Sequence, residues 1–334
     1  MTDRDPMMPE GASAPITPVG QDAQAVVAPH EMGAQAMAVP VDAPRSQWRD
    51  VWDQFRTHTG ALVGAAVFLA IVAFVVFGPL LWDVDPTKTN IRARNQGMSW
   101  SAPMGTDQLG RDLMARVMAG GRISLAVGLT AMALSMLLGT LVGVLAGYAR
   151  RLDGPLMRLT DLFLALPILP LLLVMVVLFR EPLAGAFGIE TGIFILMVTA
   201  IGITSWMQTA RIVRGDVLAL KEREFILAAR SIGTPGPAVV TRHILPNVMS
   251  PIMVSATLGI ATAIITESTL SFLGLGFPPD FPTWGRLLND GVSYLQSHPG
   301  RAVWPGLAIS LVVLSINYVG DGLRDALDPR IRGR

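Results

Sequence analysis

The sequence predicts an all-α protein that crosses a membrane six times. Hydrophobic residues make up 51% of the chain and charged residues 15%, and the mean hydropathy is +0.49, whereas soluble domains use charged residues far more often. A spanning helix needs roughly 20 mainly apolar residues. Six charge-free runs come near that length: 57–82, 123–149, 162–179, 191–210, 243–266 and 302–320. The third reaches it by starting a little before Asp161.

Arginine and lysine predict the orientation of these spans. An even number of crossings puts both termini on the same side, together with the basic residues of four segments: 45–56, 150–158, 211–242 and 324–334. These outnumber the basic residues on the other side, although the segment from Lys88 to Arg122 weakens the contrast. By the positive-inside rule we expect a multi-pass protein of the bacterial plasma (inner) membrane with both termini in the cytosol.

The segments outside the spans differ in composition. Residues 1–44 are rich in Ala, Pro, Met and Gly and lack apolar periodicity, which predicts a disordered cytosolic tail. Within 45–58, apolar side chains recur at i, i+3, i+4 and i+7, which predicts an amphipathic helix in contact with membrane lipid at the interface. The spans occupy 59–320, and 321–334 form a second cytosolic tail. The four apolar residues are Trp48, Val51, Trp52 and Phe55.

The segment 211–248 is a long basic loop whose turn and capping residues predict two short helices joined by a tight turn. Its first helix has an apolar and partly small face, suited to a groove of another protein or to packing on its own bundle. Gly233 can end that helix in the left-handed conformation, and Thr234 with Pro235 supplies an N-cap and a first-turn proline for a second helix. The face consists of Phe225, Ala228, Ala229 and Ile232.

Two carboxylates in or near the membrane need a physical reason, because charge is costly there. Glu267 shares a face with Ser255, Gly259, Ala263 and Ser271, four residues apart, so it points into the bundle. There it lines a solute path or binds a neighbouring helix. Asp161 begins the third span and either lies on the path, reaches the interface or pairs with Arg158. A second small-residue face occurs in the second span at Ser135, Gly139, Gly143 and Gly147.

Common catalytic motifs are missing from the sequence. Neither of the two lysines, Lys88 and Lys221, follows a glycine, so no phosphate-binding P-loop is present. The four histidines lack metal-site spacing, no cysteine is available, and no Gly-x-Ser-x-Gly elbow occurs. We therefore expect no enzymatic activity, no bound metal or cofactor and no nucleic-acid partner.

The basic loop resembles the "EAA" cytoplasmic loop of ABC-importer permeases. Ala228, Ala229, Gly233, Leu245 and Pro246 stand at the matching positions, while Leu227 replaces the Glu of the motif and His243 a usual Ile. Four further segments resemble the C-type permease subunit of dipeptide, oligopeptide and nickel importers, in the family's order: 105–112 with 121–125, 271–276, 282–285 and 320–330. For the first, a helix cap at Thr106 or Asp107 with an Asp107–Arg111 pair is an equally good local explanation.

The resemblance implies a type I importer permease that forms half of a translocation pore. It implies a homologous second permease, two cytosolic ABC ATPases that use the ATP, and an extracytoplasmic solute-binding protein, with di- or oligopeptides as cargo. The loop, from Phe225 through Leu227 and Gly233 to Pro246, would couple to the ATPase. Three alternatives stay open: import of nickel or another small solute, a proton-coupled transporter that uses Asp161 or Glu267, and a membrane scaffold that moves no solute.

Overall fold

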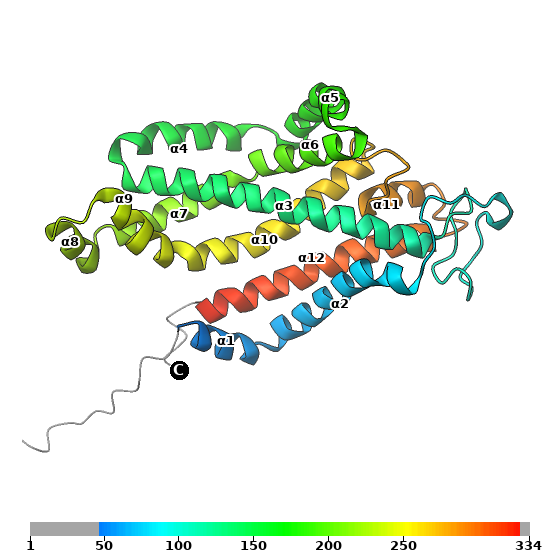
Figure 1. The fold of residues 1–334 in the computed structure, drawn as a ribbon, viewed down its shortest axis with the longest axis horizontal. Helices are drawn as coiled ribbons and strands as arrows, with labels where there is room; N and C mark the ends of the chain where they lie inside the picture. Colours follow the sequence, from blue (N-terminus) through cyan, green and yellow to red (C-terminus); the bar gives the residue numbers. More distant parts are fainter. Residues whose placement is uncertain (1–46, 328–334) are drawn as a thin grey trace, which may run out of the picture. The chain divides into compact units, whose positions relative to one another are not determined.

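A computed structural model describes residues 47–327 of the chain, and all the regular elements in that range are helical (Figure 1). They are α1 (Gln47–Thr57), α2 (Thr59–Leu81), η1 (Ile91–Ala93), α3 (Leu113–Tyr148), α4 (Arg150–Ala165), α5 (Ile168–Phe187), α6 (Ile189–Ile203), α7 (Trp206–Leu220), α8 (Glu224–Ser231), α9 (Gly236–Val239), η2 (Val240–Ile244), α10 (Leu245–Phe272), α11 (Trp284–Val292) and α12 (Gly300–Leu327).

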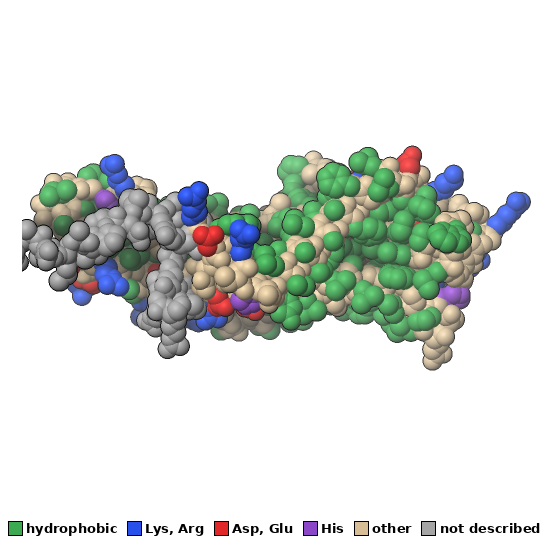
Figure 2. Space-filling view, turned by 90° about the horizontal axis from the view of Figure 1, so that it is seen from below, with side chains coloured by type: hydrophobic (Ala, Val, Ile, Leu, Met, Phe, Trp, Pro, Cys, Tyr) green, Lys and Arg blue, Asp and Glu red, His purple; other side chains and the backbone are tan. Residues whose placement is uncertain are grey.

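Five helices of this region are long and apolar enough to cross a membrane, and there are six if the bent pair α6 and α7 is one span. The prediction of an all-helical, multispan fold is confirmed. One face carries a broad area of hydrophobic side chains with basic residues toward both ends (Figure 2). Exposed side chains of α2 and α12, among them Leu69, Phe77, Leu311 and Leu314, are of the kind that lipid covers.

The third predicted span is not a single helix. The chain leaves the helical conformation at Leu166, whose ψ is 137°, and α5 starts after Pro167. A proline disfavours the α conformation in the residue before it, so the break has a local cause. α4 lies beside α3, whereas α5 is seen end-on and so runs in a different direction (Figure 1). The expectation that one helix runs from before Asp161 to Phe179 is wrong.

The fourth predicted span is bent by 41° between α6 and α7. The hydroxyl groups of Thr204 and Ser205 donate to the carbonyl oxygens of Ala200 and Ile201, at 2.8 and 2.7 Å. Hydroxyls that bond back to the preceding turn compete with the helical ladder and commonly mark a bend. α7 then continues to Leu220, ten residues beyond the predicted end of the span at Ala210.

The segments outside the spans are partly described. α1 is a helix as predicted; Val51 is buried, and the exposed Trp52 ring stacks on Phe55 with centroids 6.1 Å apart. Contact of α1 with lipid stays a prediction. The predicted tail 1–44 lies outside the described residues. α12 continues to Leu327, past the predicted boundary at 320, and the rest of the second tail is outside the described range.

Glycines let α3 and α7 pack backbone to backbone. A β-carbon on Gly139 would lie 2.7 Å from the carbonyl oxygen of Trp206, and one on Gly143 would lie 2.7 Å from that of Ala210. On Gly147 it would lie 2.7 Å from the Val217 side chain. Side chains cannot be accommodated at such distances, so the small-residue face predicted in the second span is where α7 sits.

An ion cluster, which we call the Asp107 cluster, lies at one end of the bundle; it consists of the buried Asp107, Arg111 and Arg116 and the half-buried Asp290. Asp107 accepts hydrogen bonds from Arg111 Nε at 2.6 Å and from Arg116 Nη1 at 2.5 Å. Arg116, from α3, also reaches Asp290 of α11 at 3.8 Å. The predicted Asp107–Arg111 pair is confirmed. The predicted cap is wrong, because Asp112 caps α3 by accepting from Ala115 N at 2.7 Å.

Candidate coupling surface and internal cavity

α8 projects at the opposite end of the bundle from α11 (Figure 1). Phe225, Leu227, Ala228 and Ile232 are exposed, and Ile232 keeps 84% of its surface open to solvent. A helix whose apolar residues remain exposed is suited to a groove of another protein. Ala229, predicted to lie on the same face, is instead 7% exposed and packs into the bundle.

The turn after α8 has the predicted geometry. Gly233 has φ of +84°, the left-handed region, and nothing lies within 4 Å of where its β-carbon would be. The backbone N–H of Thr234 donates to Ala229 O at 3.1 Å. The predicted cap is displaced by one residue: Pro235 rather than Thr234 precedes α9, and Pro237 is the proline of its first turn.

The buried side of α8 faces four other helices. Ile226 is fully buried in an apolar cluster with Val213 and Val217 of α7, Val239 of α9 and Val248 of α10. Arg230 lies over the ring of Tyr148 at the end of α3, with its guanidinium carbon 5.3 Å from the ring centroid. A displacement of α8 would therefore move the ends of α3, α7 and α10 with it.

Leu245 and Pro246 stand where α9 joins α10. Pro246 has no N–H to donate, and the five residues before Leu245 adopt the wider π-helical winding, closed by Leu245 N–H on Val240 O. Asn247 Nδ2 donates to the carbonyl oxygen of His243 at 2.6 Å. Leu245 packs against the α8 cluster, while Pro246 is exposed.

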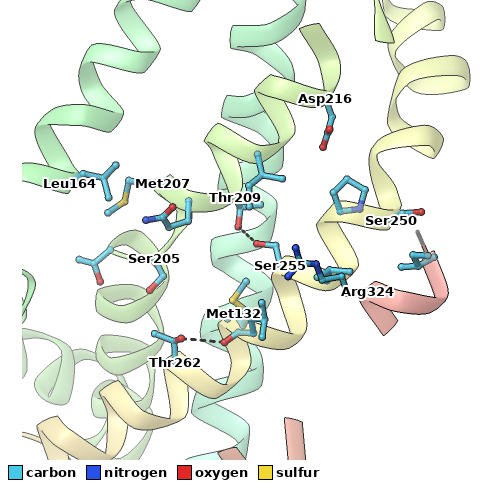
Figure 3. Close-up of a pocket in the computed structure, with 18 of the residues that line it drawn as sticks. Met132, Leu164, Ser205, Met207, Thr209, Asp216, Ser250, Ser255, Thr262 and Arg324 are labelled. Carbon is cyan, nitrogen blue, oxygen red and sulfur yellow. Dashed lines mark hydrogen bonds between the residues drawn. The ribbon is translucent and has the colours of Figure 1, made fainter. Parts of the chain in front are cut away.

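A cavity of about 900 Å³ lies among α3, α7, α10 and α12. Its wall mixes apolar side chains with hydroxyl groups, and Thr204 and Ser205 at the bend line it (Figure 3). Thr209 of α7 and Ser255 of α10 share a hydrogen bond of 3.1 Å on this wall. Two charged residues, Asp216 of α7 and Arg324 of α12, also line it.

Asp161 ties α4 to α7. Its carboxylate accepts from Arg211 Nη2 at 2.5 Å, and the expected pairing with Arg158 does not form. A second bridge, Arg214 to Asp153 at 2.5 and 2.8 Å, joins the same helices. The hydrogen bond from Arg214 keeps the pKa of Asp153 below its ordinary value. Asp161 does not line the cavity.

Glu267 is fully buried at the α11 end of α10. It accepts hydrogen bonds from Ser124 of α3 at 2.8 Å and from Ser271 at 2.6 Å. The Ser124 hydroxyl in turn accepts from Trp284 N of α11 at 3.3 Å, so the carboxylate links three helices. Its inward direction agrees with the prediction. Glu267 does not line the cavity either.

The sequence reasoning missed Asp216 and Arg324 because both fell in segments treated as loop or tail. One signal could have found Asp216. Trp206, Ala210, Val213 and Val217 recur at i, i+4, i+7 and i+11, a helical pattern that continues past Ala210. Among residues 47–327, no group of three His, Cys, Asp or Glu side chains is placed to hold a metal ion.

Comparison with known proteins agrees with a membrane component of a transport system. Residues 116–333 match the family described as "Binding-protein-dependent transport system inner membrane component". The chain belongs to this family, and it is a multi-pass membrane protein of that type. Residues 46–97 further match the "N-terminal TM domain of oligopeptide transport permease C", which places the chain with the C-type permease subunits of ABC importers.

Relatives cover most of the chain. It is 38% identical over 288 residues to the dipeptide transport system permease protein DppC of Alkalihalophilus pseudofirmus, across 86% of this chain and 91% of that protein. It is also 38% identical to the oligopeptide transport system permease protein OppC of Bacillus subtilis, across 86% of this chain and 91% of that protein. The glutathione permease GsiD of Pectobacterium atrosepticum is 38% identical, across 86% and 93%.

Proposed function

We propose that this chain is one half of the translocation pore of an ATP-driven importer of short peptides, coupled to a cytosolic ATPase through α8. A homologous second permease, two ATPase subunits and an extracytoplasmic binding protein complete the assembly. The family assignment supports an importer permease, and the names of the relatives support a peptide cargo. A proton-coupled carrier is not favoured.

One observation carries the coupling role, namely that α8 is open on one side and fixed on the other. Phe225, Ala228 and Ile232 offer an apolar patch, while Ile226 and Arg230 bind α8 to α3, α7 and α10. A partner that moved α8 would rotate these long helices as rigid bodies because their contacts are close-packed.

The remaining carboxylates fit structural roles in this mechanism. Glu267 joins α10 to α3 and α11 through serine hydroxyls, and Asp161 joins α4 to α7. Neither lines the cavity. The bend at Thr204–Ser205 does, so a change in the angle between α6 and α7 would alter the cavity when α8 is displaced. We place α8 and both termini in the cytosol, following the basic residues.

The proposed function is tested by reconstituting the chain in proteoliposomes with its second permease, its ATPases and its binding protein. Uptake of radiolabelled trialanine that needs ATP, and that persists without a proton gradient, is the expected result. Uptake driven by a proton gradient alone would contradict the proposal, and absence of uptake under every condition would support a scaffold.

The cargo is tested separately on the purified binding protein. Mass spectrometry of the ligand that copurifies with it should find peptides of a few residues. A nickel complex or another small solute in their place would keep the importer and replace the peptide assignment. Because the permease is absent from this measurement, its outcome does not depend on how α8 works.

A further inference from the structure

The internal cavity carries two opposite charges that no described residue neutralises. The Oδ2 atom of Asp216 is buried and accepts no hydrogen bond from residues 47–327. Arg324 lines the same cavity from α12, and its side chain has no hydrogen bond or ion pair with any residue in that range. Asp216 is half-buried and Arg324 is exposed, and burying one carboxylate oxygen without a hydrogen bond is costly, so the arrangement points to a missing partner for Asp216.

The other cations of α7 cannot supply that partner because they are engaged elsewhere. Arg211 pairs with Asp161, and Arg214 holds Asp153 in a two-pronged bridge. Lys221, which follows α7, donates to the carbonyl oxygen of Gly147 at 3.2 Å. Neutralising Asp216 with any of these would break an existing contact.

The largely apolar wall of the cavity also carries hydroxyl and amide groups. Thr209 and Ser255 are joined by their own hydrogen bond, and Ser255 lies beside Arg324 in the view of Figure 3. The amide of Gln208 and the hydroxyl of Ser250, also on the wall, form no side-chain hydrogen bond with residues 47–327. Both can donate and accept. The volume of about 900 Å³ falls in the range of small-molecule sites.

We propose that this cavity binds a short peptide with free termini, its α-ammonium group at Asp216 and its α-carboxylate at Arg324. Gln208 and Ser250 would bond the peptide backbone between them. The inference rests on the proposed peptide cargo and adds where the permease itself recognises it. A zwitterion supplies both missing charges in one molecule, whereas a neutral solute supplies neither. A helix of the second permease is the competing occupant.

The test uses the permease pair with its ATPases in nanodiscs, without the binding protein and without nucleotide. Equilibrium binding is measured for trialanine, N-acetyl-trialanine and trialanine amide. Losing one charge-assisted contact should weaken binding about tenfold, so both modified peptides should bind more weakly than trialanine. Asp216→Asn should bind trialanine and N-acetyl-trialanine equally yet still disfavour the amide. Arg324→Gln should bind trialanine and trialanine amide equally yet still disfavour N-acetyl-trialanine. Asp161→Asn, an acidic residue outside the cavity, should behave as wild type.

Several outcomes would overturn the proposal. Equal binding of the three peptides to the wild type would overturn it. So would an equal loss of affinity for all three peptides in Asp216→Asn or in Arg324→Gln. Separation of the two permeases on gel filtration in those variants would assign the charges to the interface between subunits. Undetectable trialanine binding, with ATP-driven trialanine uptake intact in proteoliposomes, would overturn this inference and leave the proposed function standing. Absence of that uptake would count against the proposed function itself.

Discussion

The two ends of this helix bundle are held together by different forces. At the α11 end, charges are buried: Asp107 and Arg116 are 4% and 1% exposed, and Glu267 is completely enclosed. Toward the α8 end, an apolar cluster around Ile226 joins the helices, and the ion pairs Arg211–Asp161 and Arg214–Asp153 are more open to solvent than those of the α11 end. In the proposed mechanism, the buried ionic contacts fix one end, whereas the exposed apolar face of α8 binds a partner at the other end.

The largest loss of stability should follow a break in the Asp107 cluster. In Arg116→Met, Asp107 and Asp290 would keep their charges without the arginine that joins them, at a cost of roughly 3–5 kcal/mol. That is a large part of the stability of a folded protein. We expect little protein in the membrane and a strongly lowered midpoint of thermal unfolding in detergent.

Arg122→Met is the matched control, since Arg122 lies on the same helix and, within residues 47–327, donates only to the carbonyl oxygens of Val75 and Val76. It should reach the membrane at near-normal abundance. An Arg116→Met protein as abundant and as heat-stable as this control would show that the cluster does not stabilise the α11 end.

Glu267 should rank second. Glu267→Leu leaves the hydroxyls of Ser124 and Ser271 buried without their acceptor, at roughly 1–3 kcal/mol. Glu267→Gln keeps an oxygen of the same reach and should preserve most of the stability and the uptake. Abundance and ATP-dependent uptake are measured for both. A Glu267→Gln transporter that assembles normally but moves no solute would replace the packing role with a charge-dependent role in the path.

The charge of Asp107 should make stability depend on pH. Burial raises the pKa of Asp107. Hydrogen bonds from Arg111 and the charge of Arg116 lower it by more than burial raises it, so the pKa lies below its ordinary value. A lowered folded pKa contributes stability that is present above the unfolded pKa of about 3.9 and is lost as the pH falls through the folded value. The thermal midpoint should therefore drop below about pH 4.

Asp107→Asn provides the comparison for that titration. It should be less stable at pH 6, and its midpoint should fall less steeply in acid because the titrating group is gone. Midpoints are measured from pH 6 to pH 3. Parallel curves for the wild type and Asp107→Asn would assign the acid sensitivity to other carboxylates.

The two ends also differ in how far the sequence predicted them. The α8 end follows local rules: a 3.6-residue apolar period, then a glycine whose φ is positive, and both are legible within ten residues. The Asp107 cluster joins Arg116 to Asp290, far apart in the chain, so only the Asp107–Arg111 pair, four residues apart, could be predicted. Ala229 was predicted to lie on the open face because apolar periodicity shows which residues share one side of a helix. It does not show which of them a neighbouring helix covers.

Errors in the middle of the chain had a different origin. Hydropathy located the runs that became α5 and α6–α7 but treated each as a straight helix. The break at Leu166 comes from the restriction that Pro167 places on the residue before it, and the bend comes from the hydroxyls of Thr204 and Ser205, which bond back to the preceding turn. Hydropathy measures neither effect. Ending the fourth span at Ala210 placed Asp216 in a loop, and so its position on the cavity wall was not predicted.

Substitutions at α8 should change stability the least. They should leave the amount of protein in the membrane nearly normal while reducing ATPase binding and uptake. Gly233→Val forces a β-branched residue into the left-handed region, at roughly 1–2 kcal/mol, and nothing within 4 Å would clash with its β-carbon. Ala228→Asp places a charge on the open face and breaks no described contact. Both proteins should reach the membrane at near-normal abundance, because insertion depends on the apolar spans. Both should copurify with less ATPase and lose most ATP-dependent uptake.

Gly154→Val, in a helix and with nothing within 4 Å of its β-carbon position, is the control for a valine at an open glycine. Unchanged ATPase binding and uptake in both α8 variants would show that coupling occurs elsewhere, and the open face of α8 would then need another partner.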